Sequence, residues 1–357
     1  MLKLSHLEKN IEAEAITKLS ELIDSIPSIN LLKVEQQSHI SNMAVDFIAD
    51  IDVSGKRHTL ICEVKSSGQP RYVQLGLLQL SNYIVRNNQK ATPILIAPYL
   101  SPQAQKLCKD NQINYLDFEG NAHLIFDNAL IDRQVASKPV SDQRELRSIF
   151  KPKSAQILKV LLQNPERQWR VIELAEKADV SIGHVSNVRN NLLDREWAKV
   201  SDDGFFLSKP NDLLDAWHNE YTPPKGNRVQ FYTTLHGSAF ENAARNTLKD
   251  NLNGLAAFSS FSAANWIAPY GRTNIQYFYA DEIGLERLKL GLNLSSSYKG
   301  ENVVITVLKD TSLLLQTIEP APGAICTDKI QTYLDLYKSG ERGKEAAIHL
   351  REEKLKW

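Results

Sequence analysis

The sequence predicts a multi-domain α/β protein, on the basis of its length, its composition and its hydrophobic patterning. The 357 residues exceed the size of one ordinary domain, so two or three domains are expected. Hydrophobic residues make up 42% of the chain and charged residues 24%, as in ordinary globular proteins. In the N-terminal third, short apolar strand patterns alternate with amphipathic helix patterns, which predicts a mixed sheet covered by helices.

Periodicity assigns the elements of this first region. Residues 6–26 are expected to form a helix, because Leu7, Ile11, Ala15, Leu19 and Leu22 make one apolar stripe. A second helix at 101–110 begins with Ser101-Pro102, a favourable cap and first-turn pair. The remaining predicted elements are strands at 29–36, 44–52, 58–66, 94–97, 114–118 and 122–126, and a helix at 71–87.

Two of these strands carry charged side chains opposite an apolar face. In the first strand, Val45, Phe47, Ala49 and Ile51 share one face and Asp46 takes the other. The second strand follows a turn at Ser54-Gly55-Lys56, and in it Glu63 and Lys65 point together, away from Cys62 and Val64. We therefore expect Asp46, Glu63 and Lys65 to converge on one spot.

Such a cluster suits metal-assisted phosphodiester hydrolysis. Two carboxylates on neighbouring strands are hard oxygen ligands for Mg²⁺ or Mn²⁺, with water and substrate phosphate completing the coordination. The metal would polarise the phosphodiester and lower the pKa of a bound water. Lys65 would orient that water or offset the charge that develops on the phosphate.

An Asp at a strand start, followed after a short turn by Glu-x-Lys on the next strand, resembles the PD-(D/E)xK, or restriction-endonuclease-like, superfamily. The helix at residues 72–83 is similar to the helix that follows this motif in many members, where a Gln faces the site; Gln79 matches that position, with Gln74 as the alternative. The resemblance implies a nuclease-like domain over residues 1–135, in which Asp46 and Glu63 ligate the metal and Lys65 and Gln79 complete the catalytic set.

The alternative is a domain that has lost this chemistry and serves as a scaffold. Glu-x-Lys also occurs at Glu352-Glu353-Lys354, in a charged terminal segment without the hairpin context.

The middle of the chain, residues 136–222, is predicted to hold a basic linker and a DNA-binding module. The linker covers 132–150 and continues its basic run to Lys151 and Lys153. Helices are expected from 154, at 169–178 and at 181–193, followed by a hairpin from Trp197 to Leu207 with an acidic turn at Asp202-Asp203. The spacing of Leu174, Val185 and Leu192 resembles that of winged helix-turn-helix proteins, which place the third helix in the major groove of double-stranded DNA.

The resemblance implies that outward side chains of this third helix read bases and phosphates, since Asn pairs with adenine and Arg with guanine. These residues are Ser181, His184, Asn187, Arg189 and Asn190. The alternatives are that the module packs against other domains or mediates a homodimer.

Residues 221–227 form a predicted linker, after which 228–357 are expected to form a third, α/β domain. The segments 329–337 and 340–347 resemble the C-terminal region of AbiE-type antitoxins of type IV toxin–antitoxin systems. The resemblance implies transcriptional regulation and a cognate toxin as protein partner.

The bulk composition excludes several classes. The chain has 42 basic and 42 acidic residues, which argues against salt-driven, nonspecific nucleic-acid binding by the whole molecule. No apolar run has the length of a membrane span, and the N-terminus lacks a signal-peptide core. The cysteines, Cys62, Cys108 and Cys326, fit neither a disulfide framework nor a zinc site, so a cytoplasmic protein without a membrane partner is expected.

Three functions remain open at this point: a magnesium-dependent DNA endonuclease, a noncatalytic winged-helix regulator, and an antitoxin that neutralises a partner.

Overall fold

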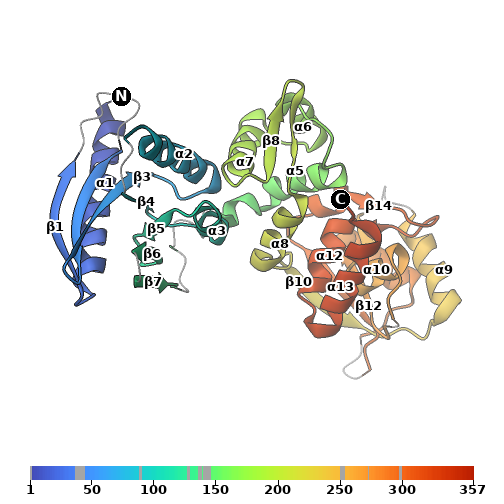
Figure 1. Ribbon diagram of the computed structural model, residues 1–357. Helices are drawn as coiled ribbons and strands as arrows, with labels where there is room; N and C mark the ends of the chain where they lie inside the picture. Colours follow the sequence, from blue (N-terminus) through green and yellow to red (C-terminus); the bar gives the residue numbers. More distant parts are fainter. Residues whose placement is uncertain are drawn as a thin grey trace. The chain divides into compact units, whose positions relative to one another are not determined.

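The chain is a mixed α/β protein, as predicted (Figure 1). Its computed structural model describes residues 2–36, 45–87, 91–126, 129–135, 139, 146–249, 254–271, 273–296 and 300–357. The chain forms two compact units. One comprises Met1–Leu146 with Arg189–Ala198, and the other comprises Arg147–Val188 with Lys199–Trp357.

The first unit is built on a seven-stranded sheet in the simple order β1-β2-β3-β4-β5-β6-β7. The pairs β1–β2, β2–β3, β5–β6 and β6–β7 are antiparallel, whereas β3–β4 and β4–β5 are parallel. Each parallel connection runs through a helix, as parallel strands require. The elements are α1 (Leu2–Asp24), β1 (Ile29–Gln36), β2 (Phe47–Val53), β3 (Lys56–Val64), α2 (Pro70–Asn87), β4 (Thr92–Ala97), α3 (Pro102–Asp110), β5 (Asn114–Asp117), β6 (Ala122–Phe126) and β7 (Ala129–Arg133).

Helices cover both faces of this sheet (Figure 1). On one face, Ala15, Leu19 and Leu22 of α1 pack with Phe47 and Leu60. On the other face, α2 and α3 pack on the alternate side chains of the same strands, which include Ile61 and Leu95. Both clusters are buried, so the central strands β3 and β4 have an apolar layer on each side.

The β2–β3 hairpin positions the predicted catalytic side chains. Its two-residue turn consists of Ser54 (φ 52°) and Gly55 (φ 89°), and positive φ at both residues matches the strand twist of a hairpin. Phe47 pairs with Cys62 and Val53 with Lys56, so the predicted pairing of the two strands is confirmed.

Three details of the first unit differ from the prediction. Val45 packs with the α2 face instead of sharing a face with Phe47, because the backbone bends at Asp46 before β2 begins. Arg133, assigned to the linker, ends the additional strand β7, which pairs with β6. Lys138 and Arg144 of the predicted basic run lie outside the described residues.

In the described residues of the middle of the chain, helices and a hairpin lie close to the predicted ranges. They are α5 (Pro152–Gln163), α6 (Val171–Lys177), α7 (Ile182–Asp194), β8 (Ala198–Ser201) and β9 (Gly204–Leu207), and the helix α8 (Pro210–Glu220) follows. Trp169, just before α6, forms an antiparallel bridge with Phe205 of β9. Gly204 is required there, since a Cβ would lie 2.4 Å from the Trp169 carbonyl oxygen and φ is +152°.

The C-terminal sheet has six strands in the order β10-β13-β12-β11-β15-β14. Helix α10 packs on β12 and against both α12 and α13, while α11 packs against α9 and β13. Strand β10 occupies part of the predicted linker at 221–227. The elements are β10 (Gly226–Phe231), α9 (Gly237–Leu248), β11 (Ala256–Phe258), α10 (Ser260–Ile267), β12 (Gln276–Ala280), α11 (Glu282–Gly291), β13 (Val303–Leu308), the 3₁₀ helix η1 (Ser312–Leu315), β14 (Thr317–Ile318), β15 (Cys326–Thr327), α12 (Lys329–Tyr337) and α13 (Gly340–Lys354).

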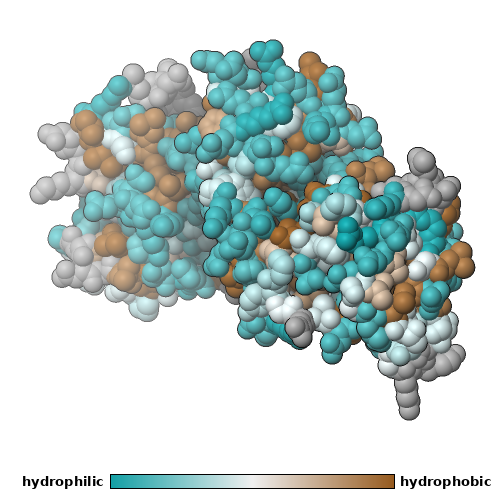
Figure 2. Space-filling view, turned by 90° about the vertical axis from the view of Figure 1, so that its right-hand side faces the viewer, coloured by the Kyte–Doolittle hydropathy of each residue, from teal (hydrophilic) through white to brown (hydrophobic). Residues whose placement is uncertain are grey.

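Among the described residues, no helix is both long enough and apolar enough to cross a bilayer. The face shown in Figure 2 carries hydrophilic residues throughout, with hydrophobic residues in scattered small groups.

Candidate active site

Asp46 and Glu63 lie next to each other across the β2–β3 hairpin. Asp46 immediately precedes Phe47 and Glu63 immediately follows Cys62, and these two neighbours are register partners. Asp46 Oδ2 accepts a 2.6 Å hydrogen bond from the Val64 amide, so its carboxylate lies against the short segment that carries Glu63 and Lys65. The Glu63 side chain is only 2% exposed.

Lys65 connects this pair of strands to helix α2. Its Nζ donates to Glu63 Oε1 at 2.6 Å and to Gln79 Oε1 at 2.5 Å. The Lys65 side chain is 18% exposed, so the ion pair is shielded from water on most sides. The structure thus brings Gln79 to Lys65, and Gln74 and Gln79 are both exposed residues of this helix.

Gly76 makes room for the Lys65 stem. A Cβ at this position would lie 2.5 Å from Leu95 Cδ1 and 3.1 Å from Lys65 Cε. Glycine in a helix interior costs about 1 kcal/mol relative to alanine, so its presence here is explained by the close approach of Leu95 and Lys65. A glycine in the interior of an otherwise regular amphipathic helix is a sequence signal for such a close approach. The Glu-x-Lys motif does not include this position, so the motif did not predict the role of Gly76.

The donor set fits a magnesium ion chemically. Magnesium is commonly held by one or two carboxylates, with water and substrate oxygens in its remaining positions. Asp46 and Glu63 supply two such carboxylates. No cluster of three or more acidic, histidine or cysteine side chains that could hold a metal occurs within the described residues, so a site built from protein ligands alone is not present there.

The thiol beside this cluster, that of Cys62, is fully buried. Burial raises the pKa of Cys62 well above its ordinary value, and the negative charge of Asp46 raises it further. A thiol in this state is protonated at neutral pH and behaves as a small apolar side chain.

The five predicted DNA-contacting residues lie on or just before α7. Ser181, Asn187 and Asn190 are exposed and Arg189 is half-buried. His184 is half-buried too, and its Nε2 lies 3.1 Å from the Ser154 hydroxyl of α5. Ser181 also has a local role, since its hydroxyl accepts a hydrogen bond from the His184 amide at the start of the helix.

Two further polar clusters were not anticipated from sequence. Asp117 is fully buried and accepts hydrogen bonds from the amides of Leu100 and Asn121, so it holds the turn after β5. Asp335 of α12 is also buried, and the hydroxyl of Tyr221 bonds to it. The second contact joins residues 114 positions apart, and no local pattern signals such a pair.

No family model, curated protein or solved structure matches this chain. The resemblances to the PD-(D/E)xK superfamily, to winged-helix proteins and to AbiE-type antitoxins therefore stay predictions.

Proposed function

We propose that the first unit is a metal-dependent DNA endonuclease whose catalytic residues are Asp46, Glu63, Lys65 and Gln79. The observation that carries this proposal is the Lys65 ammonium, which donates at the same time to the buried Glu63 carboxylate near the end of β3 and to Gln79 on α2. A lysine held by two partners has lost its rotamer freedom before substrate arrives, which is the preorganisation that electrostatic catalysis needs.

The carboxylates and the lysine have complementary tasks in this proposal. Asp46 and Glu63 would hold Mg²⁺ or Mn²⁺, and the bound ion supplies Lewis acidity toward the phosphodiester and a water of lowered pKa. Lys65 offsets the negative charge that develops on the phosphate. Gln79 keeps the ammonium directed along the hairpin, so its substitution should weaken catalysis less than that of Lys65.

The experiment is cleavage of supercoiled plasmid with Mg²⁺ by the full chain. The wild type should nick or linearise the plasmid, and Lys65→Ala should reduce the rate by about a hundredfold or more. Lys33→Ala is the matched control, since Lys33 is a 62% exposed lysine on β1 of the same sheet. If wild type and Lys65→Ala cleave at the same rate, or if neither cleaves, the endonuclease proposal is rejected.

A second candidate function is recognition of double-stranded DNA without cleavage, through α7. The supporting observation is that Ser181, just before α7, and Asn187 and Asn190, on α7, are exposed. Gly183 adds an open position there, since a Cβ would meet no atom within 4 Å. Small exposed residues at a helix start allow close approach to a groove.

Charge reversal tests this candidate. Arg189→Glu should weaken DNA binding and reduce the slope of affinity against salt concentration. Lys344→Glu on α13 is the control for a general effect of net charge. Equal affinities and slopes for the two variants would place the DNA contact elsewhere.

A further inference from the structure

A cavity in the C-terminal sheet domain has the features of a ligand site. Its volume is about 490 Å³, which falls within the usual range for small-molecule pockets. Strands β10, β12 and β13 and helices α10 and α12 contribute its walls, and all of its lining residues belong to the second compact unit.

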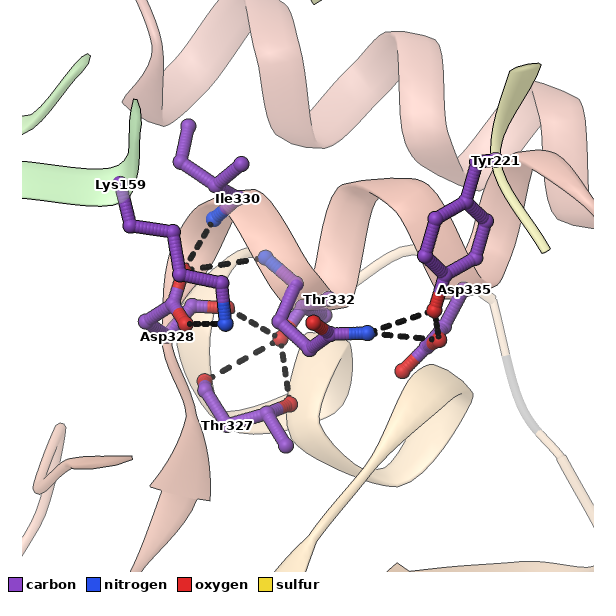
Figure 3. A network of polar contacts seen from close by, with 8 residues as sticks. Lys159, Tyr221, Thr327, Asp328, Ile330, Thr332 and Asp335 are labelled. Atoms are coloured by element: carbon purple, nitrogen blue, oxygen red, sulfur yellow. Dashed lines mark hydrogen bonds and ion pairs between the residues drawn. The ribbon is translucent and has the colours of Figure 1, made fainter. Parts of the chain in front are cut away.

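A buried carboxylate lines this cavity. Asp335 is 5% exposed, and its Oδ1 accepts from the Tyr221 hydroxyl at 2.5 Å and from Gln331 Nε2 at 3.0 Å (Figure 3). Its Oδ2 is buried, and a hydrogen bond from the Tyr279 hydroxyl lowers the pKa of the carboxyl. A carboxylate offers about four lone-pair sites, so one that lines a cavity and already accepts three hydrogen bonds can accept another from a ligand.

The environment holds Asp335 rigidly. Gln331 also bonds to the Tyr221 hydroxyl, so the three side chains form a closed triangle (Figure 3). At the start of the same helix, Asp328 caps the amides of Ile330 and Gln331 and pairs with buried Lys159 at 2.8 Å. Because α12 is fixed at both places, the direction of the Asp335 carboxylate is fixed as well.

A positively charged wall belongs to the same cavity. Arg228 of β10 and Lys338, directly after α12, both line it, together with Ser259 and Ser260 at the N-terminus of α10. The Ser259 side chain makes no capping hydrogen bond, although the Ser259 carbonyl accepts from the amides of Ser262 and Ala263. Helix N-termini favour anions, and two cations beside one strengthen that preference.

The backbone at this wall is strained. Ser260 has φ +48°, a conformation that non-glycine residues rarely adopt, at the turn from β11 into α10. Such outliers gather at binding and catalytic sites, where surrounding structure maintains them.

Aromatic side chains complete the lining. Tyr277 and Tyr279 of β12 and Phe261 of α10 border the cavity, and the rings of Phe261 and Tyr277 lie 6.0 Å apart. Flat aromatic faces of this kind bind the π-face of a nucleobase without selecting one base.

We propose that this cavity binds a mononucleotide, with the phosphate at Arg228, Lys338 and the α10 N-terminus, the base against the tyrosines, and a base amino or ribose hydroxyl group donating to Asp335. The ligand class follows from the combination of an anion site, an aromatic surface and one buried acceptor in a cavity of this size. The site is independent of the nuclease proposal, since it uses no residue of the first unit.

Calorimetric titration of the full chain tests the proposal, with AMP, CMP, GMP and UMP as separate probes. At least one should bind saturably, and Arg228→Ala should weaken it by about tenfold or more. Lys344→Ala, a helix lysine outside the cavity, should bind like the wild type. Asp335→Asn should also bind more weakly, because the amide presents a donor in place of one acceptor oxygen.

Two further titrations measure how much the phosphate and the nucleoside each contribute to binding. Inorganic phosphate alone and the corresponding nucleoside should each bind at least about tenfold more weakly than the nucleotide. The proposal is overturned if no mononucleotide binds at millimolar concentration, if phosphate binds as tightly as the nucleotide, if only an oligonucleotide binds, or if Arg228→Ala leaves the affinity unchanged.

Discussion

The buried carboxyl of Asp335 predicts a specific dependence of stability on pH. Burial raises its pKa from 3.8 to about 6, against the opposing effect of hydrogen bonds from Tyr221, Tyr279 and Gln331. The folded protein therefore holds this proton more tightly than the unfolded chain does. At about 1.4 kcal/mol per pH unit, the raised pKa is equivalent to about 3 kcal/mol.

The sign follows from the direction of the pKa change. The stabilisation is fully present below pH 3.8, where both states are protonated, and it is lost as pH rises through about 6. Asp335→Asn removes the titrating group while keeping an oxygen that can accept from Tyr221. Between about pH 4 and pH 7, the wild type should therefore lose about 2–3 kcal/mol of unfolding free energy relative to this variant.

Urea denaturation of the full chain at several pH values, followed by tryptophan fluorescence, measures this difference. Other buried carboxyls, such as Asp117, have a raised pKa too, but their effects are common to both proteins and cancel. Asp203→Asn, at an exposed turn, is the control and should follow the wild type. Parallel curves for wild type and Asp335→Asn would refute the reasoning, because the carboxyl would then titrate alike in both states.

Two further predictions concern glycines with close neighbours. Gly76→Ala should lower stability by about 1–3 kcal/mol and slow plasmid cleavage as well, because its Cβ would meet the Leu95 methyl at 2.5 Å; unchanged denaturation and cleavage would contradict this packing. Gly204→Ala should cost a similar amount, since its Cβ would lie 2.4 Å from the Trp169 carbonyl oxygen at φ +152°. Gly183→Ala is the matched comparison in a denaturation series and should be neutral or stabilising by about 0.5–1 kcal/mol, because its Cβ meets no atom within 4 Å; equal losses for both substitutions would contradict the role of the close contact.

Local signals account for most of what could be predicted in the first unit. The strand 29–36 was predicted at its observed bounds, and the turn at Ser54-Gly55 was predicted by its composition. The predicted cap at Ser101 is present, with its hydroxyl accepting from the Ala104 amide. These features depend on residues within a few positions of one another, which is the range over which sequence patterns carry information.

The missed elements lack such signals. Strand β7 is five residues long and lies at the sheet edge, where one side chain, Leu130, is 63% exposed. Strand β10 follows Pro223 and Pro224 and has mostly exposed residues, so its composition indicates a linker and its pairing with β13 alone makes it a strand. Both β7 and β10 are therefore strands because they pair with a neighbouring strand, although their own sequences do not indicate a strand.

The part of the candidate site that depends on neighbouring residues was predictable from the sequence. The two-residue period of a strand places Glu63 and Lys65 on one side without any knowledge of the fold. The choice between Gln74 and Gln79 depended on how α2 packs on β3, and the Asp335 cluster depended on contacts across more than a hundred residues. Long-range geometry of this kind leaves no trace in a single sequence.

The most direct test of the proposed active site is anomalous diffraction from crystals of the full chain soaked in Mn²⁺. The proposal predicts an anomalous peak between the carboxylates of Asp46 and Glu63 that is absent in crystals of Glu63→Gln. Manganese bound only elsewhere, or no manganese between these two carboxylates in the wild type, would contradict it.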